Sequence, residues 1–174
     1  MLFRSFDVQD PTAPSMVGST RVGGNFVGAA VSGSTGFGVF ATGMSAFDLS
    51  NPAAPRVIGF LPLPATAFSV TLAGSLAFIA NGEAGITIAE VADARAMRQL
   101  AQIDTPGVAK RILIEGSLAF VADGLGGLRI LDLTNPRAPL LVGALGQLGD
   151  VQSVAVAGRH AYISAGTNIF VVNV

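Results

Sequence analysis

Cysteine is absent from this sequence of 174 residues, and histidine occurs once. The chain therefore has no disulfides, thiolate metal sites or thiol nucleophile, and no site that needs two histidines. Charged residues are also scarce at 12%, about half the usual share. Ten Lys and Arg against eleven Asp and Glu give a net charge of −1, and neither sign gathers into a block. Since a nucleic-acid binder needs a basic stripe, we expect no nucleic-acid partner.

Long apolar runs are missing too, although hydrophobic residues make up 51% of the chain. No stretch reaches the roughly 18 uninterrupted apolar residues of a membrane span, so no membrane insertion is expected. The first residues, MLFRSFD, contain no apolar core or small-residue cleavage site, so no signal peptide is predicted in this chain. This hydrophobicity also excludes a disordered chain and predicts a large internal core.

One phrase recurs along the chain and ends, in its full form, in a proline-rich turn. Its copies are FDVQDPTAP at 6–14, FDLSNPAAP at 47–55, the degenerate AEVADARAM at 89–97, and LDLTNPRAP at 131–139. A second phrase, GSLAFIANG at 74–82, recurs at 116–124 and 158–166 with the same spacing of 42 residues. Two independent phrases with one period establish an internal repeat.

A period of 40 to 45 residues is typical of paired-helix solenoids or of four-stranded propeller blades. Short β-branched runs bounded by Gly, Pro, Asn or Asp favour strands, and no long window carries a helical apolar stripe free of glycine and proline. In the third repeat the four strands, A to D, are expected at 110–114, 118–122, 128–133 and 140–144. The sequence therefore predicts an all-β β-propeller of ~42-residue four-stranded blades, about four repeats in all, with both faces of each sheet buried by its neighbours.

The phrases GSLAFVADG at 116–124, GLRILDLTNPRAP at 127–139 and LVG at 141–143 resemble the LVIVD repeat. That family forms β-propeller blades and occurs mostly in bacterial and archaeal cell-surface or secreted proteins. The resemblance therefore implies an extracellular or cell-surface location. It implies no activity and no cofactor.

The repeat count leaves two arrangements open for this single domain. We expect a partial blade at 1–24, blades at about 25–64, 65–106 and 107–148, and a partial blade at 149–174. A D-like strand at 15–19 would complete the last blade in a closed four-blade ring. The alternative is a segment of a larger propeller, or a chain that closes by pairing with another copy. The second arrangement is favoured because the sequence starts and stops within a repeat and duplicates strand C.

Two isolated motifs are interpreted as structural. Residues 36–41 fit G-x-G-x-x-A, but no helix can follow to hold a pyrophosphate, so the segment is expected to be a blade strand. The lone His160 has no second catalytic group in the repeat frame, so it is expected to be a partly exposed strand residue. We predict no catalytic residue.

Acidic and amide residues recur beside the turn between strands C and D. Residues copied once per repeat are typical of turn support, where they accept backbone N–H bonds. We assign this structural role to Asp7, Asp48, Glu90, Asp132, Asn51 and Asn135, and by the same logic to Asp10 and Asp93.

The B–C and D–A loops are expected to share the opposite rim, and their polar residues differ between repeats. Variable loops on a repeated scaffold are typical sites of specificity. The candidate ligand residues on this rim are Asn81, Glu83, Asp104, Lys110, Arg111, Asp123, Gln147, Asp150 and Asn168. Several are oxygen donors of the kind Ca²⁺ prefers, but no Asp-x-Asp-x-Asp spacing occurs, so no metal site is predicted.

The sequence favours a non-catalytic binding or scaffold module that presents its rim to a protein or glycan. One alternative is part of a propeller enzyme, a hydrolase or lyase. Another is an assembly unit that forms a homo-oligomer, or joins the remainder of a longer propeller, through open blade edges.

Overall fold

The computed structural model describes residues 2–174, and every regular element in this range is a β-strand. These residues include no helix long and apolar enough to cross a membrane. The all-β prediction is therefore confirmed.

The strands form five antiparallel sheets, in which neighbours along the chain pair with one another. The first is a two-stranded hairpin of β1 (Leu2–Asp7) and β2 (Ser15–Arg21). Three four-stranded sheets follow. The first four-stranded sheet contains β3 (Gly28–Ser32), β4 (Thr35–Phe40), β5 (Gly43–Asp48) and β6 (Arg56–Pro62).

The second four-stranded sheet contains β7 (Ser69–Ala73), β8 (Leu76–Ala80), β9 (Ile86–Glu90) and β10 (Arg98–Ile103). The third contains β11 (Arg111–Glu115), β12 (Leu118–Ala122), β13 (Leu128–Asp132) and β14 (Leu140–Leu145). The last sheet has three strands: β15 (Val151–Ala157), β16 (His160–Ala165) and β17 (Asn168–Asn173). The four strands expected in the third repeat are confirmed, with bounds shifted by one residue in three of them.

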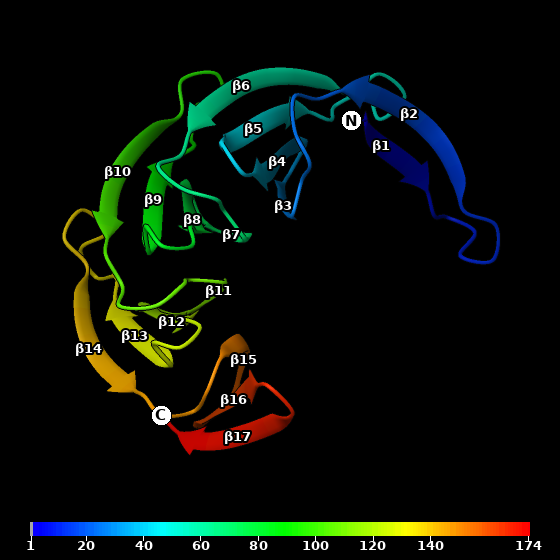
Figure 1. The fold of residues 1–174 in the computed structure, drawn as a ribbon. Helices are drawn as coiled ribbons and strands as arrows, with labels where there is room; N and C mark the ends of the chain where they lie inside the picture. Colours follow the sequence, from blue (N-terminus) through cyan, green and yellow to red (C-terminus); the bar gives the residue numbers. More distant parts are fainter. Residues whose placement is uncertain (1) are drawn as a thin grey trace.

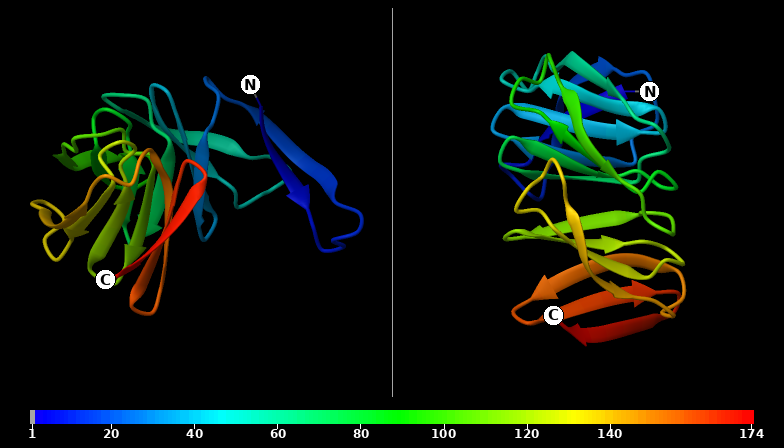
Figure 2. Two further views of the ribbon diagram at one scale, coloured as in Figure 1. Left: turned by 60° about the horizontal axis from the view of Figure 1, so that its bottom comes forward. Right: turned by 90° about the vertical axis from the view of Figure 1, so that its left-hand side faces the viewer.

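The sheets follow one another around an open arc, with the first strand of each complete sheet on the inner side and the fourth on the outer side (Figure 1). The hairpin β1–β2 projects at one end of the arc, and the last sheet lies at the other (Figure 2). Among residues 2–174, strand β2 pairs only with β1, and β17 pairs only with β16. The closed four-blade ring, the less favoured of the two arrangements, is therefore not observed: residues 15–19 pair with β1 at the opposite end of the arc from β17 (Figure 1).

Both faces of the second and third four-stranded sheets are buried, which explains why their strands are apolar at nearly every position. In β8, Ala77 and Ile79 lie in a core shared with the preceding sheet, whereas Phe78 and Ala80 lie in a core shared with the next. Strand β12 repeats this arrangement, since Val121 belongs to the second core and Phe120 to a third. Because successive side chains of a strand point to opposite faces, each face needs its own apolar set.

Hydrogen bonds outside the sheets join one sheet to the next. Two B–C loops make a two-way backbone bridge to a residue at or just before the following inner strand, Gly82 with Ala109 and Gly124 with Val151. Both glycines have a positive φ, of 57° and 55°, which a residue with a side chain rarely adopts. These bridges set the spacing of the loops along the rim.

Candidate functional site

The C–D turns are held by side chains that accept backbone N–H bonds two residues further on. Asp48 Oδ1 accepts from the Ser50 amide at 2.9 Å, and Asn51 Oδ1 accepts from the Ala53 amide at 3.0 Å. The same pair of bonds is made by Asp7 and Asp10, and by Asp132 and Asn135. In the degenerate copy, Asp93 Oδ1 still accepts from the Arg95 amide at 2.9 Å. These residues lie on the turns and support them locally.

Glu90 occupies the same repeat position but interacts differently. Its carboxylate accepts a hydrogen bond of 2.6 Å from Arg98 Nε on the neighbouring strand β10. By contrast, hydrogen bonds from Thr12, Ser50 and Thr134 lower the pKa of three exposed turn carboxyls, those of Asp10, Asp48 and Asp132. The hydrogen bonds that shape these three turns thus also favour the charged form of their carboxyls.

Two of the predicted rim residues, Asn81 and Asp123, lie beneath the rim and are fully buried. Asp123 accepts hydrogen bonds from Thr105 Oγ1 at 2.6 Å and from the Gly107 amide at 3.0 Å, and its Oδ2 lies 3.7 Å from Arg129 Nε. This carboxylate therefore anchors the loop between β10 and β11 from within. Asn81, one repeat earlier, donates to Thr87 Oγ1 at 3.2 Å.

Two cavities open on the rim between successive loops, and they occupy equivalent repeat positions. The first rim pocket, of about 450 Å³, is lined by Ala65, Thr66, Phe68, Gly82, Glu83 and Val108. The second, of about 510 Å³, includes the residues 42 positions after all six of these: Gly107, Val108, Lys110, Gly124, Leu125 and Asp150. Glu83 and Val108 line both pockets, so the two are neighbours along the rim. Phe68 and Lys110 thus occupy equivalent repeat positions, so the first pocket has an aromatic ring where the second has an ammonium group.

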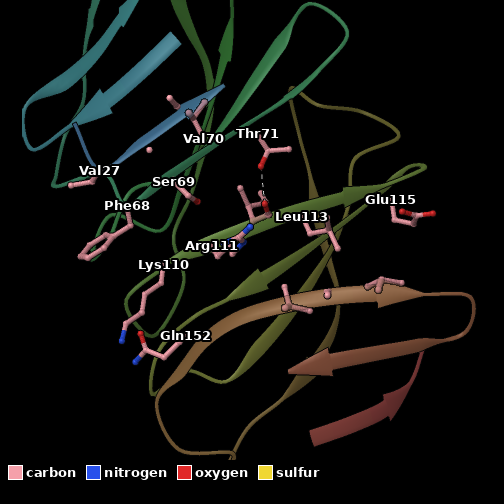
Figure 3. A pocket seen from close by; sticks show the side chains of 16 residues that line it. Val27, Phe68, Ser69, Val70, Thr71, Lys110, Arg111, Leu113, Glu115 and Gln152 are labelled. Atoms are coloured by element: carbon pink, nitrogen blue, oxygen red, sulfur yellow. Dashed lines mark hydrogen bonds between the residues drawn. The ribbon is translucent and has the colours of Figure 1, made fainter. Parts of the chain in front are cut away.

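A third cavity, which we call the inner groove, runs along the inner side of the arc and measures about 490 Å³. Residues of the innermost strands β3, β7, β11 and β15, and of the segments just before them, line it. Phe68, Lys110 and Gln152 are spaced 42 residues apart and lie at the same end of the groove, where Lys110 also lines the second rim pocket (Figure 3). This end, the groove mouth, connects the groove to the rim.

A polar network crosses the groove mouth between the last two sheets. Lys110 Nζ donates to Asp150 Oδ1 at 2.6 Å, and Gln152 Nε2 donates to Asp150 Oδ2 at 2.7 Å. Only about a fifth of the Lys110 side chain is exposed, which strengthens this pair relative to one in open solvent. The carboxylate therefore fixes both neighbours in place.

The remaining rim candidates are spread more widely. Arg111 lines the inner groove and Glu83 both rim pockets. Asp104 and Gln147 are exposed in D–A loops, and Asn168 is exposed at the start of β17.

Phe68 and Gln152 were not among the predicted residues, although their position one repeat before and after Lys110 was a usable signal. Among residues 2–174, no group of three His, Asp or Glu side chains is placed to hold a metal ion.

The sheets and their repeat spacing define the class of this protein: an all-β repeat protein built from four-stranded antiparallel sheets. Within that class, residues 106–145 and 148–172 match the model of the LVIVD repeat. This part of the chain is therefore similar to the LVIVD repeat. The matched residues include Lys110, Asp150 and Gln152 of the groove mouth but not Phe68.

Solved structures share this fold at low sequence identity. A functionally unknown protein from Desulfotomaculum acetoxidans superimposes with a TM-score of 0.84 at 16% identity, covering 99% of this chain and 58% of that one. The computationally designed protein Ika8 gives 0.76 at 8% identity over 92% of this chain, which spans about half the length of Ika8 (50%). The designed protein Ika4 gives 0.73 at 8% identity, covering 87% of this chain and 92% of that one. No curated protein matches the sequence.

Proposed function

We propose that the chain is part of a β-propeller and serves as a non-catalytic binding module of a cell-surface or secreted protein. Its ligand, a protein or a glycan, is bound at the groove mouth and the adjoining rim pockets. The match to the LVIVD repeat supports the surface location, because that family is found mostly in such proteins. The open arc supports a propeller because its sheets are arranged radially, as blades are (Figure 1).

The observation that carries the proposal is the network of Lys110, Asp150 and Gln152 where two cavities meet. The turns on the opposite rim repeat one hydrogen-bond scheme, whereas this rim changes its side chains from repeat to repeat. Residues that vary on a constant scaffold suit recognition better than support.

Binding screens against glycan and protein libraries, followed by paired substitutions, test this function. We expect the double variant Lys110→Ala/Asp150→Ala to weaken binding of any ligand found. The matched control is Glu90→Ala/Arg98→Ala, which removes an ion pair on the outer strands of the second four-stranded sheet. Equal binding by the wild type and both double variants would contradict a site at the groove mouth.

Assembly is a second candidate function, supported by the last sheet. It has one strand fewer than the three sheets before it, and the side chains of Ile169 and Val171 on β17 are 75% and 58% exposed. An open strand edge with apolar side chains is a template for pairing with another chain. Light scattering at two protein concentrations tests this role: a mass that rises with concentration supports it, and a constant 17.6 kDa contradicts it.

A further inference from the structure

Arg111 is the basic residue lining the inner groove that lacks a carboxylate partner. Three ion pairs form among residues 2–174, namely Arg98 with Glu90, Lys110 with Asp150, and Arg129 with Asp123, and Arg111 takes part in none of them. Its neighbour Lys110 is already neutralised by Asp150. A guanidinium group that faces a cavity without a counter-charge is well suited to bind an anion, since its planar donors match a carboxylate.

Ser69 lies at the position one repeat before Arg111, on the neighbouring inner strand β7 (Figure 3). Its Oγ is buried and has no hydrogen-bond partner within the described residues. Thr71, two residues along the same strand, instead donates to the Ile112 carbonyl at 2.8 Å. An unsatisfied buried hydroxyl is costly, so a ligand oxygen beside Ser69 would remove a cost that the free protein bears.

Phe68 provides an apolar surface at the mouth of the same groove. Its side chain is 40% exposed and lines both the inner groove and the first rim pocket. A cavity of this size is large enough for a small organic ligand, and the exposed ring of Phe68 offers that ligand an apolar contact beside the polar groups of the groove.

The charges in the groove are separated along its length. Glu115 ends the strand that Arg111 begins, four residues away. At about 3.3 Å per residue the separation is roughly 13 Å. This exceeds the screening length of about 8 Å at physiological ionic strength, so the carboxylate of Glu115 does little to reduce the attraction of an anion to Arg111.

From these contacts we infer that the groove mouth binds a sugar unit that carries a carboxylate. The carboxylate pairs with Arg111, a sugar hydroxyl bonds to Ser69 Oγ, and the apolar face of the ring lies against Phe68. This inference rests on the proposed binding function and names the class of its ligand as an acidic glycan.

Calorimetric titration of the whole chain with glucuronate tests the inference, with glucose and inorganic phosphate as comparison ligands. Glucuronate is expected to bind more tightly than either, and added salt is expected to weaken it. Arg111→Gln is expected to weaken glucuronate binding by at least about tenfold, the loss typical of a charged hydrogen bond. Ser69→Ala is expected to give a smaller loss.

Arg137→Gln is the matched control, because this arginine lies in an exposed C–D turn on the opposite rim. Thermal melting of each variant shows that the fold is retained. Equal binding of glucose and glucuronate, equal binding of phosphate, or no binding of glucuronate would each overturn the inference. If a protein ligand or a neutral glycan instead binds and responds to Lys110→Ala/Asp150→Ala, the acidic-sugar inference fails while the proposed function stands.

Discussion

Gly59 on β6 lies directly against the backbone carbonyl of Ala94, in the C–D turn of the next sheet. Gly18 on β2 makes the same approach to the Pro52 carbonyl one sheet earlier. A Cβ atom at either position would collide with backbone, which cannot rotate away as a side chain can. The outer strands thus carry glycine where a neighbouring turn rests on them.

Replacing Gly59 by alanine is therefore expected to destabilise the protein by about 1–3 kcal/mol, the usual cost of forcing extra atoms into a packed contact. Urea unfolding of the variant and the wild type measures the difference. Gly146→Ala is the control, because no neighbouring atom lies within 4 Å of a Cβ built there. Equal losses for the two variants would show that the contact with Ala94 is not the cause.

Gln147 offers a substitution with the opposite effect. It is the non-glycine residue with a positive φ, 61°, in the described chain. A side chain in this left-handed region costs about 1–2 kcal/mol. Glycine avoids this cost but loses more conformational entropy on folding, so the substitution recovers only part of it. Gln147→Gly is expected to raise the melting temperature by a few degrees, corresponding to about 0.5 kcal/mol. A lower melting temperature would contradict this account.

The turn acids make stability depend on pH on the acid side. Side-chain hydrogen bonds from Thr12, Ser50 and Thr134 lower the folded-state pKa of three turn carboxyls below the ordinary aspartate value of about 3.9. Each carboxylate therefore contributes stability above that value and loses it as the pH falls through its lower folded pKa. The affected residues are Asp10, Asp48 and Asp132.

The triple alanine variant of these residues is expected to be less stable than the wild type at pH 6. The difference is expected to shrink as the pH falls below about 4. Chemical unfolding at several pH values from 6 to 2 measures it. A gap between the two proteins that stays constant over this range would show that ionisation of these groups does not stabilise the turns.

Asp123 is expected to be more sensitive than any exposed acid. Asp123→Ala leaves Thr105 and Arg129 without their buried partner and is expected to cost about 3 kcal/mol. Asp123→Asn is expected to cost less, because asparagine occupies this position one repeat earlier at Asn81. Unfolding free energies of the two variants test the ranking, and an alanine variant no worse than the asparagine variant would refute it.

The strands could be predicted from the sequence because each is a short apolar run bounded by turn residues, and the repeat set their order. The last sheet was harder, since the residues of β2 fit a fourth strand equally well by pattern. Pairing with β1, a contact between adjacent segments, decided the outcome.

The rim residues show a different limit. Asp123 and Asp150 are both acidic residues in loops, yet one is buried under the loop from β10 to β11 and the other holds Lys110 at the groove mouth. Burial of a loop side chain depends on how the neighbouring sheet covers it, which local sequence does not encode. The repeat position of Phe68, 42 residues before Lys110, was a signal in the sequence, but its place at the groove mouth depends on the inner strands lying side by side.

The three separate cores have a mechanical consequence. Each core joins only two successive sheets, so the arc is a series of nearest-neighbour couplings rather than one shared interior. Under load or in denaturant, such a series opens from its ends, where a sheet has a neighbour on one side only. At the groove mouth, the ion pair of Lys110 with Asp150 links the last two sheets, so a ligand bound there would act as a clamp on the coupling between them.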